Sequence, residues 1–248
     1  MADMSDPRVP LVLAHARACK EAKNRREDGP VLASNLLDLS GIDLSSANLS
    51  DANLEGADFT GANLSSAYFI RANLTRANFE GADLSAAELY FSKLNGADLS
   101  RADLTDTKLT NADLSHANLT DAKLLRAYLG SAILSRADLS SADLTHATLT
   151  DAKLVDANLT AANLNAANLI AANIGFADLT NANITKAQLD SALYTDVAQD
   201  GYPKEVAEKV ILFHNPELRR SRQQVKKRLV VELRADGKLY IKTPIFKY

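Results

Sequence analysis

The sequence contains no tryptophan, a single cysteine and few aromatic residues. With Cys19 as the one thiol, an internal disulfide framework is excluded, and so is a zinc site built from several cysteines. The hydrophobic share of 46% is ordinary for a globular protein, but most of it is alanine and leucine. We therefore expect a core built mainly from small and medium aliphatic side chains.

Long apolar runs are also lacking, and no stretch approaches the length of a membrane span. Near the N-terminus, only residues 9–14 form an apolar run, which is too short for a signal peptide and follows no basic region. The net charge of −3 does not favour a nucleic-acid or membrane partner. We expect a cytoplasmic protein in a reducing compartment, without membrane contact.

A repeat of five residues fills the middle of the chain. Every fifth residue from Leu39 to Leu189 is Leu, Phe or Ile, without insertion. Alanine lies two residues before nearly all of these positions. Asp or Asn usually separates the two, and Ser or Thr usually follows, so the unit is A-(D/N)-L-(S/T)-x. The residues that replace alanine are Leu37, Ile42, Ser92 and Thr107.

A period of five excludes a continuous helix or strand. In a helix, residues five apart would be rotated by about 140° and would spread over all sides. In a strand, successive leucines would point to opposite faces, because five is odd. Short extended segments with a corner every five residues fit, with Ala and Leu inside and Asp/Asn and Ser/Thr outside. Gly41, Gly61 and Gly96 stand at such corners. We therefore expect an all-β solenoid.

This A-(D/N)-L-x-x phrase resembles the motif of the pentapeptide-repeat proteins, over residues 37–191. The resemblance implies a right-handed quadrilateral β-helix with four pentapeptides per coil, and hence about eight coils for this tract. Catalysis needs groups that converge in a concavity, which a packed rod does not offer. We therefore expect no enzyme activity, no catalytic residues, no cofactor and no metal.

The ends of a solenoid expose core side chains and unpaired edges, so caps are expected at both. Residues 1–36 are predicted as an N-terminal helical cap, with a helix over 10–26. The apolar residues assigned to this helix are Leu11, Val12, Ala14, Ala18 and Ala22.

Residues 192–248 are predicted as a basic C-terminal segment. Helices are expected after Pro203 and from about residue 216, and Asp236-Gly237 between two alternating runs predicts a β-hairpin. We also consider a homodimer formed through the two flanks.

Residues 20 apart should stack on one face of such a rod. Two adjacent faces then carry most acidic motif residues, and we assign them as the candidate DNA-mimic surface. They are Asp38, Asp58, Asp98, Asp138 and Asp178 on the first face, and Asp43, Asp83, Asp103 and Asp143 on the second.

Another face departs most from the motif and combines aromatic residues with mixed charges, which is typical of a protein contact. We assign it as the candidate partner face. Three explanations stay open: a partner or dimer surface, cover by the chain's own C-terminal helices, or free drift of outward positions. Its residues are Tyr68, Ile70, Glu88, Tyr90, Phe91, Lys108, Tyr128 and Ile170.

The sequence favours a non-catalytic scaffold that binds a protein partner through its rod faces or C-terminal segment. The alternative comes from the resemblance: some bacterial members mimic DNA, bind DNA gyrase or topoisomerase, and confer antibiotic resistance by protecting it from quinolones. The acidic, uninterrupted rod favours this alternative. Its modest net charge counts against it, and so do the lysines within the rows. These are Lys93, Lys108, Lys123 and Lys153.

Overall fold

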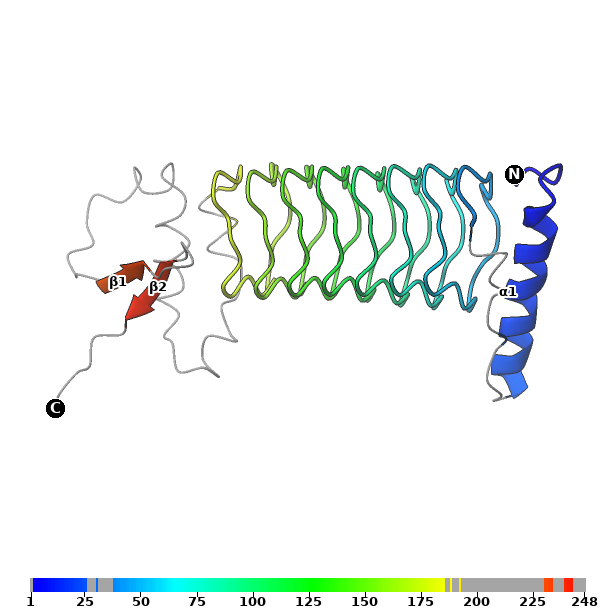
Figure 1. The fold of residues 1–248 in the computed structure, drawn as a ribbon. Coiled ribbons are helices and arrows are strands. Elements are labelled where there is room, and N and C mark those ends of the chain that lie inside the picture. Colours follow the sequence, from blue (N-terminus) through cyan, green and yellow to red (C-terminus); the bar gives the residue numbers. More distant parts are fainter. Residues whose placement is uncertain are drawn as a thin grey trace.

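The computed structural model describes residues 2–25, 30, 38–185, 188, 192, 230–233 and 239–242. Residues 38–185 form a rod of stacked coils, and helix α1 (Arg8–Arg25) lies across one end of it (Figure 1). In this described part, no helix combines the length and apolar character needed to cross a bilayer.

Strands β1 (Val230–Leu233) and β2 (Leu239–Lys242) pair antiparallel as a two-stranded hairpin. They lie on either side of Asp236-Gly237 in the sequence, where the hairpin is predicted. The helices predicted after Pro203 and from about residue 216 lie outside the described residues.

Parallel β-bridges join residues 20 apart all along the rod. They run without a break from Asp38–Asp58 to Asn163–Asn183. Backbone hydrogen bonds follow the same spacing, because the N–H of every core leucine or phenylalanine from Leu39 to Leu164 donates to a carbonyl of the next coil. Leu39 N, for example, donates to Asp58 O at 2.7 Å. With a corner at every fifth residue, each coil has four sides.

The corner residue has a positive φ at every fifth position from Gly41 to Asn181, between 55° and 68°. The turn closes through the next residue, as when Ile42 N donates to Leu39 O at 3.3 Å. A positive φ at the third residue of the turn is the type II arrangement. Glycine takes this conformation without strain, yet most corners carry side chains, Phe91 among them. The winding of the coils therefore holds these residues in a costly conformation.

The alanine and leucine positions point inward and are buried from Leu39 to Ile184. Three phenylalanines replace leucine near the N-terminal end. The Phe59 and Phe79 rings stack at 5.0 Å between centroids, and Phe69 meets both edge-on from another side of the coil. One continuous apolar core thus runs along the rod.

Two polar residues at alanine positions are buried and hydrogen-bonded to the backbone. Ser92 Oγ donates to Leu89 O at 2.8 Å, and Thr107 Oγ1 donates to Leu84 O at 2.7 Å. Among the described residues, every buried side-chain nitrogen or oxygen has a partner. These substitutions therefore leave the core intact.

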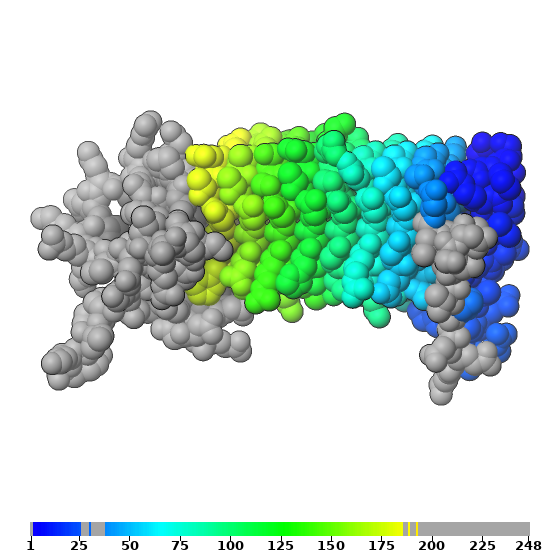
Figure 2. Space-filling view, in the orientation of Figure 1, coloured from blue at the N-terminus to red at the C-terminus, as the bar shows by residue number. Residues whose placement is uncertain are grey.

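Helix α1 lies against the first coil, where a preceding coil would otherwise be needed (Figure 2). Its buried residues are Val9, Val12, Ala16, Cys19 and Ala22. The predicted apolar side is wrong for three residues: Leu11 is 51% exposed, and Ala14 and Ala18 also face solvent. The buried residues recur at intervals of three and four, which keeps them on one stripe of the helix, and Leu11 and Ala18 lie off that stripe.

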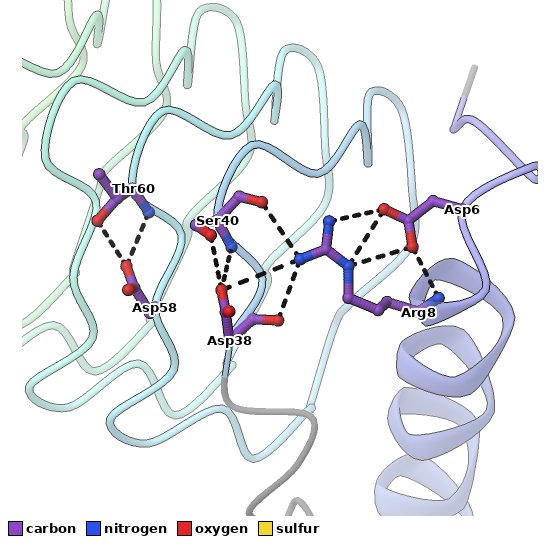
Figure 3. A network of polar contacts seen from close by, with 6 residues as sticks. All are labelled: Asp6, Arg8, Asp38, Ser40, Asp58 and Thr60. Carbon is purple, nitrogen blue, oxygen red and sulfur yellow. Dashed lines mark hydrogen bonds and ion pairs between the residues drawn. The ribbon is translucent and has the colours of Figure 1, made fainter.

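The N-terminal segment also supplies donors to carbonyls of the first coil. Arg8 Nη1 donates to Asp38 O and Ser40 O, both at 3.3 Å (Figure 3). Asp3 N donates to Asp43 O at 3.1 Å. His15 Nε2 lies 2.7 Å from Asn53 O and must carry the proton, because a carbonyl only accepts. These bonds pair part of the first coil's edge, and an open edge would invite aggregation.

A cluster of three charged residues connects the C-terminal end of α1 to the rod. The Asp51 carboxylate pairs with Lys23 of α1 and with Arg71 of the next coil, whose Nε lies 2.8 Å from Asp51 Oδ1. The Asp51 side chain is only 3% exposed. The hydrogen bond from Arg71, together with Lys23, lowers the Asp51 pKa from 3.8 to about 2. The folded chain therefore favours the ionised form.

We expect Asp51→Asn to weaken the attachment of α1 and to lower the free energy of unfolding. Because the folded pKa is depressed, the Asp51 contribution is present above pH 3.8 and is lost as the pH falls through about 2. Denaturant titrations from pH 7 to pH 2 should show the wild-type advantage over Asp51→Asn shrinking in that window. A difference that stays constant down to pH 2 would contradict the assignment.

Candidate interaction surfaces

The bridges place Tyr68, Glu88, Lys108 and Tyr128 in one stacked row, each one coil from the next. We call the side of the rod that carries this row the aromatic face. It is the predicted partner face, and it includes Ile70 and Tyr90 in the neighbouring column, Phe91 at the corner and Ile170 farther along.

The aromatic face presents apolar side chains to solvent. Tyr68 is 41% exposed, Tyr128 49%, Ile170 56% and Phe91 58%. Ile70, Glu88, Tyr90 and Lys108 are half-buried, because neighbouring coils cover their sides. The aromatic face therefore combines exposed apolar side chains with half-buried apolar and charged ones.

An ion pair lies at the centre of the row. Lys108 Nζ donates to Glu88 Oε1 at 2.7 Å, and this bond raises the Lys108 pKa above its ordinary value. The charges of Glu88 and Lys108 thus offset each other between Tyr68 and Tyr128. A partner would meet two aromatic rings with a balanced pair of charges between them.

The two acidic faces carry the predicted aspartates, and their carboxylates have a structural use. The residue after each core leucine has an N–H directed outward, and the motif Asp or Asn accepts from it. Asp58 Oδ1 accepts from Thr60 N at 3.0 Å and from the Thr60 hydroxyl at 2.5 Å (Figure 3). The same bond recurs along both acidic faces. The aspartates that make it are Asp38, Asp43, Asp58, Asp83, Asp98, Asp103, Asp138, Asp143 and Asp178.

Asparagines alternate with aspartates on the first acidic face and bridge the coils. Asn118 Nδ2 donates to Asp98 Oδ1 at 3.0 Å, and Asn158 Nδ2 donates to Asp138 Oδ1 at 3.0 Å. The row therefore forms a ladder of amides and carboxylates. Asp98 and Asp138 are each held by the backbone of their own coil and by the asparagine of the next coil.

Most basic residues of the rod pair with a carboxylate about one coil away. Corner arginines make most of these pairs, for example Arg126 with Asp106 at 2.6 Å. Sequence reasoning missed these pairs, although residues of opposite charge 20 or 21 apart would have revealed them. The other pairs are Arg71–Asp51, Arg76–Glu55, Arg101–Glu80, Lys108–Glu88, Lys123–Asp103 and Arg136–Asp156.

Pairing leaves the net charge on the acidic faces. In residues 38–185, acidic residues outnumber basic ones by nine, and this whole excess falls on the two acidic faces and their corners. Within that tract, Asp58, Asp83, Asp98, Asp138 and Asp143 make no ion pair. Lys123 interrupts its row, as predicted, but it lies 3.5 Å from Asp103 and offsets that charge.

The exposed Phe176 was not predicted as a surface residue. It is 47% exposed and occupies a corner with φ 56°, on the side of the rod beyond Ile170. In the described part of the chain, no group of three or more His, Cys, Asp or Glu side chains could hold a metal. The two predicted kinds of surface, aromatic and acidic, are thus the candidate interaction sites there.

The sequence pattern described as pentapeptide repeats matches the chain in eight copies. The matches lie within residues 38–76, 62–101, 97–136, 122–160 and 162–192, which together make up more than half of the chain. No curated protein matches the chain in sequence.

Several solved structures are similar. A pentapeptide repeat protein of the Arabidopsis thaliana thylakoid lumen is 37% identical over 40% of this chain and 69% of its own, with a TM-score of 0.39. HetL, a pentapeptide repeat protein involved in heterocyst differentiation regulation from Nostoc sp. strain PCC 7120, is 32% identical over 64% and 90%, with a TM-score of 0.24. QnrB1, a plasmid-mediated fluoroquinolone resistance protein, is 21% identical over 60% and 74%, with a TM-score of 0.42.

The structural use of the aspartates gives a direct test. Asp98→Ala removes the acceptor of Ser100 N and of Asn118 Nδ2, and we expect it to lower the free energy of unfolding by about 1 kcal/mol. Asp98→Asn keeps an oxygen in the same place and should cost less than half as much. Chemical denaturation of both variants measures the difference. Equal losses would mean that charge, and not the acceptor, is what Asp98 contributes.

Proposed function

The chain belongs to the pentapeptide-repeat family, and we propose that it is a non-catalytic scaffold that binds a protein partner through its aromatic face. We propose for residues 37–191 the right-handed winding and the about eight coils of that family. A reducing compartment such as the cytoplasm suits the single buried thiol of Cys19.

One observation carries this proposal: the aromatic face lacks the motif Asp or Asn at five successive levels, from Tyr68 to Thr148. Tyr68, Lys108 and Tyr128 offer no carboxylate or amide oxygen to the following N–H, and Glu88 is bound to Lys108. On the acidic faces the fold keeps this acceptor at nearly every level. Each loss costs about 0.5–1.5 kcal/mol, and the unbroken run of losses on this one face supports selection over free drift.

Exposed aromatic side chains are the type of residue that contributes most to protein interfaces. Tyr68 and Tyr128 lie three coils apart, or about 14 Å, on a straight support. Such a rigid support loses little entropy on binding, since the backbone is already fixed. The geometry therefore favours recognition of a folded or extended protein surface.

Replacing both tyrosines tests this function. We expect Tyr68→Ser with Tyr128→Ser to keep the coil folded, because both side chains point outward, and to weaken capture of a partner at least tenfold. Affinity capture from the native host, followed by quantification of the bound proteins, measures the loss. Asn78→Ser with Asp138→Ser is the matched control, with the same spacing on the first acidic face.

An identical set of captured proteins for the tyrosine variant, the control and the wild type would remove the aromatic face as the binding site.

A second candidate function rests on the acidic faces. Their unpaired carboxylates could imitate DNA phosphates and bind DNA gyrase or topoisomerase, which would protect it from quinolones. The charge density is low for this task. The tract 38–185 is about 36 Å long and carries one net charge per roughly 4 Å, against about one per 1.7 Å in duplex DNA.

Neutralising the acidic faces tests this second function without harming the fold, since Asn keeps the acceptor. A DNA mimic should lose gyrase binding at least tenfold when Asp98, Asp103, Asp138 and Asp143 are all changed to Asn, while the chain still unfolds in one cooperative transition. A supercoiling assay with and without quinolone measures the effect. Wild-type chain that leaves supercoiling and drug response unaltered over a wide concentration range would eliminate gyrase as the target.

A further inference from the structure

We propose that the partner of the aromatic face is a second copy of this chain, bound face to face with the two rods antiparallel. The inference rests on the protein-binding function proposed above and names the partner. Along the rod, the stacked row is Tyr68, Glu88, Lys108, Tyr128. In the antiparallel arrangement, Tyr68 of one copy lies opposite Tyr128 of the other, and Glu88 of one copy lies opposite Lys108 of the other.

The symmetry of this arrangement is a two-fold axis within the interface, parallel to the sides of the coils and midway between the Glu88 and Lys108 levels. Such an axis keeps every column of side chains opposite itself and reverses its order. The contact is therefore isologous and closed, which is the commonest form of homodimer. The straight stack of bridges 20 residues apart makes the match hold over several coils.

The neighbouring column is complementary in size under the same axis. Ile70 meets Gly130 of the second copy, and Tyr90 meets Thr110, so a larger side chain faces a smaller one at each level. Gly130 adds no side chain to its face, and no positive φ requires a glycine there. The position therefore provides a recess where Ile70 needs one.

Charge selects this register over its neighbours. A shift by one coil in either direction sets Glu88 against its own copy, or Lys108 against its own copy. Parallel rods would keep equal levels together but would reverse the order of the columns, so Glu88 and Lys108 would face the neighbouring column of the second copy and both attractive pairs would be lost. Only the antiparallel register centred between these levels makes two attractive pairs, and like charges placed opposite each other oppose the shifted registers.

The rest of the rod agrees with a second copy as the occupant. The first acidic face lies on the opposite side of the coil from the aromatic face, so its unpaired carboxylates stay in solvent and apart in the dimer. The overlap runs from the Asn48 level to the Thr148 level, about 29 Å including both end coils. A contact of this size is at the low end for protein interfaces, so we expect association at micromolar concentrations. Ile170 lies beyond the overlap.

Sedimentation of the full chain over a wide concentration range tests the dimer. We expect a reversible monomer–dimer equilibrium, weakened at least tenfold by Gly130→Arg, because the new side chain would fill the recess for Ile70. The nearest atoms to a Cβ at this position lie at 3.8 Å, so the coil itself accommodates the substitution. Ser140→Arg adds the same charge at the equivalent column of the first acidic face and should leave the equilibrium unchanged.

Cross-linking tests the register. Asn48 and Thr148 occupy opposed levels in the proposed dimer but lie five coils, or about 24 Å, apart within one chain. Mixed Asn48→Cys and Thr148→Cys chains should be linked by a short bifunctional thiol reagent, whereas neither variant alone should be. Cys19 is buried and serves as an internal background in all three samples.

The inference is overturned by a chain that is monomeric at every concentration, or by a dimer that Gly130→Arg does not weaken. Equal cross-linking within each single variant would likewise exclude the antiparallel register. The protein-binding function would stand apart from these outcomes. A monomer whose captured proteins are lost in the Tyr68→Ser, Tyr128→Ser variant would keep that function and reject the second copy as the partner.

Discussion

A backbone turn with positive φ at every fifth residue closes each coil of this rod. Outside glycine this conformation costs about 1 kcal/mol or more, yet most corners carry a side chain. The corner N–H offsets part of that cost by bonding to the next coil, as when Ser46 N donates to Ser65 O at 2.9 Å. The turns bring the leucines inward, and burial of those leucines keeps the turns closed. Corner and core thus stabilise each other along the whole stack.

Since the backbone and the inward side chains define the coil, outward positions are constrained by one remaining group, the N–H after each leucine. Asp and Asn satisfy it on the acidic faces. The aromatic face forgoes this bond and still folds, because a single missing bond is small beside the burial of a leucine, which is worth about 1.5–3 kcal/mol. The surface can therefore change from level to level while the core stays the same.

The five-residue period predicted the inward residues and the corners, because both follow from geometry that the leucines define. The 20-residue stacking was implied by the resemblance to the pentapeptide-repeat proteins, and the bridges between residues 20 apart confirm it. The same stacking rule places Tyr68 and Tyr128 on one face. The stacking rule could not predict how exposed each residue is. Ile70 and Tyr90 are half-buried because side chains of the adjacent coils cover the column beside the row. For α1, an ordinary helical period fits several stripes, so the buried side depended on how the helix meets the first coil. Leu11 is exposed for that reason.

The alternation of Asp and Asn on the first acidic face bears on which surface is functional. Adjacent carboxylates stacked about 4.8 Å apart would repel, whereas an Asn between them donates its amide to the lower Asp. Asp38 and Asp58, the one adjacent pair of aspartates in this row, lie where Arg8 approaches Asp38 at 3.9 Å. The alternation therefore stabilises the ladder. It also leaves this face with about half of the carboxylates that a continuous row of phosphate mimics would need. The acidity follows from the fold, while the tyrosines of the aromatic face do not, and this contrast directs the search for function to the aromatic face.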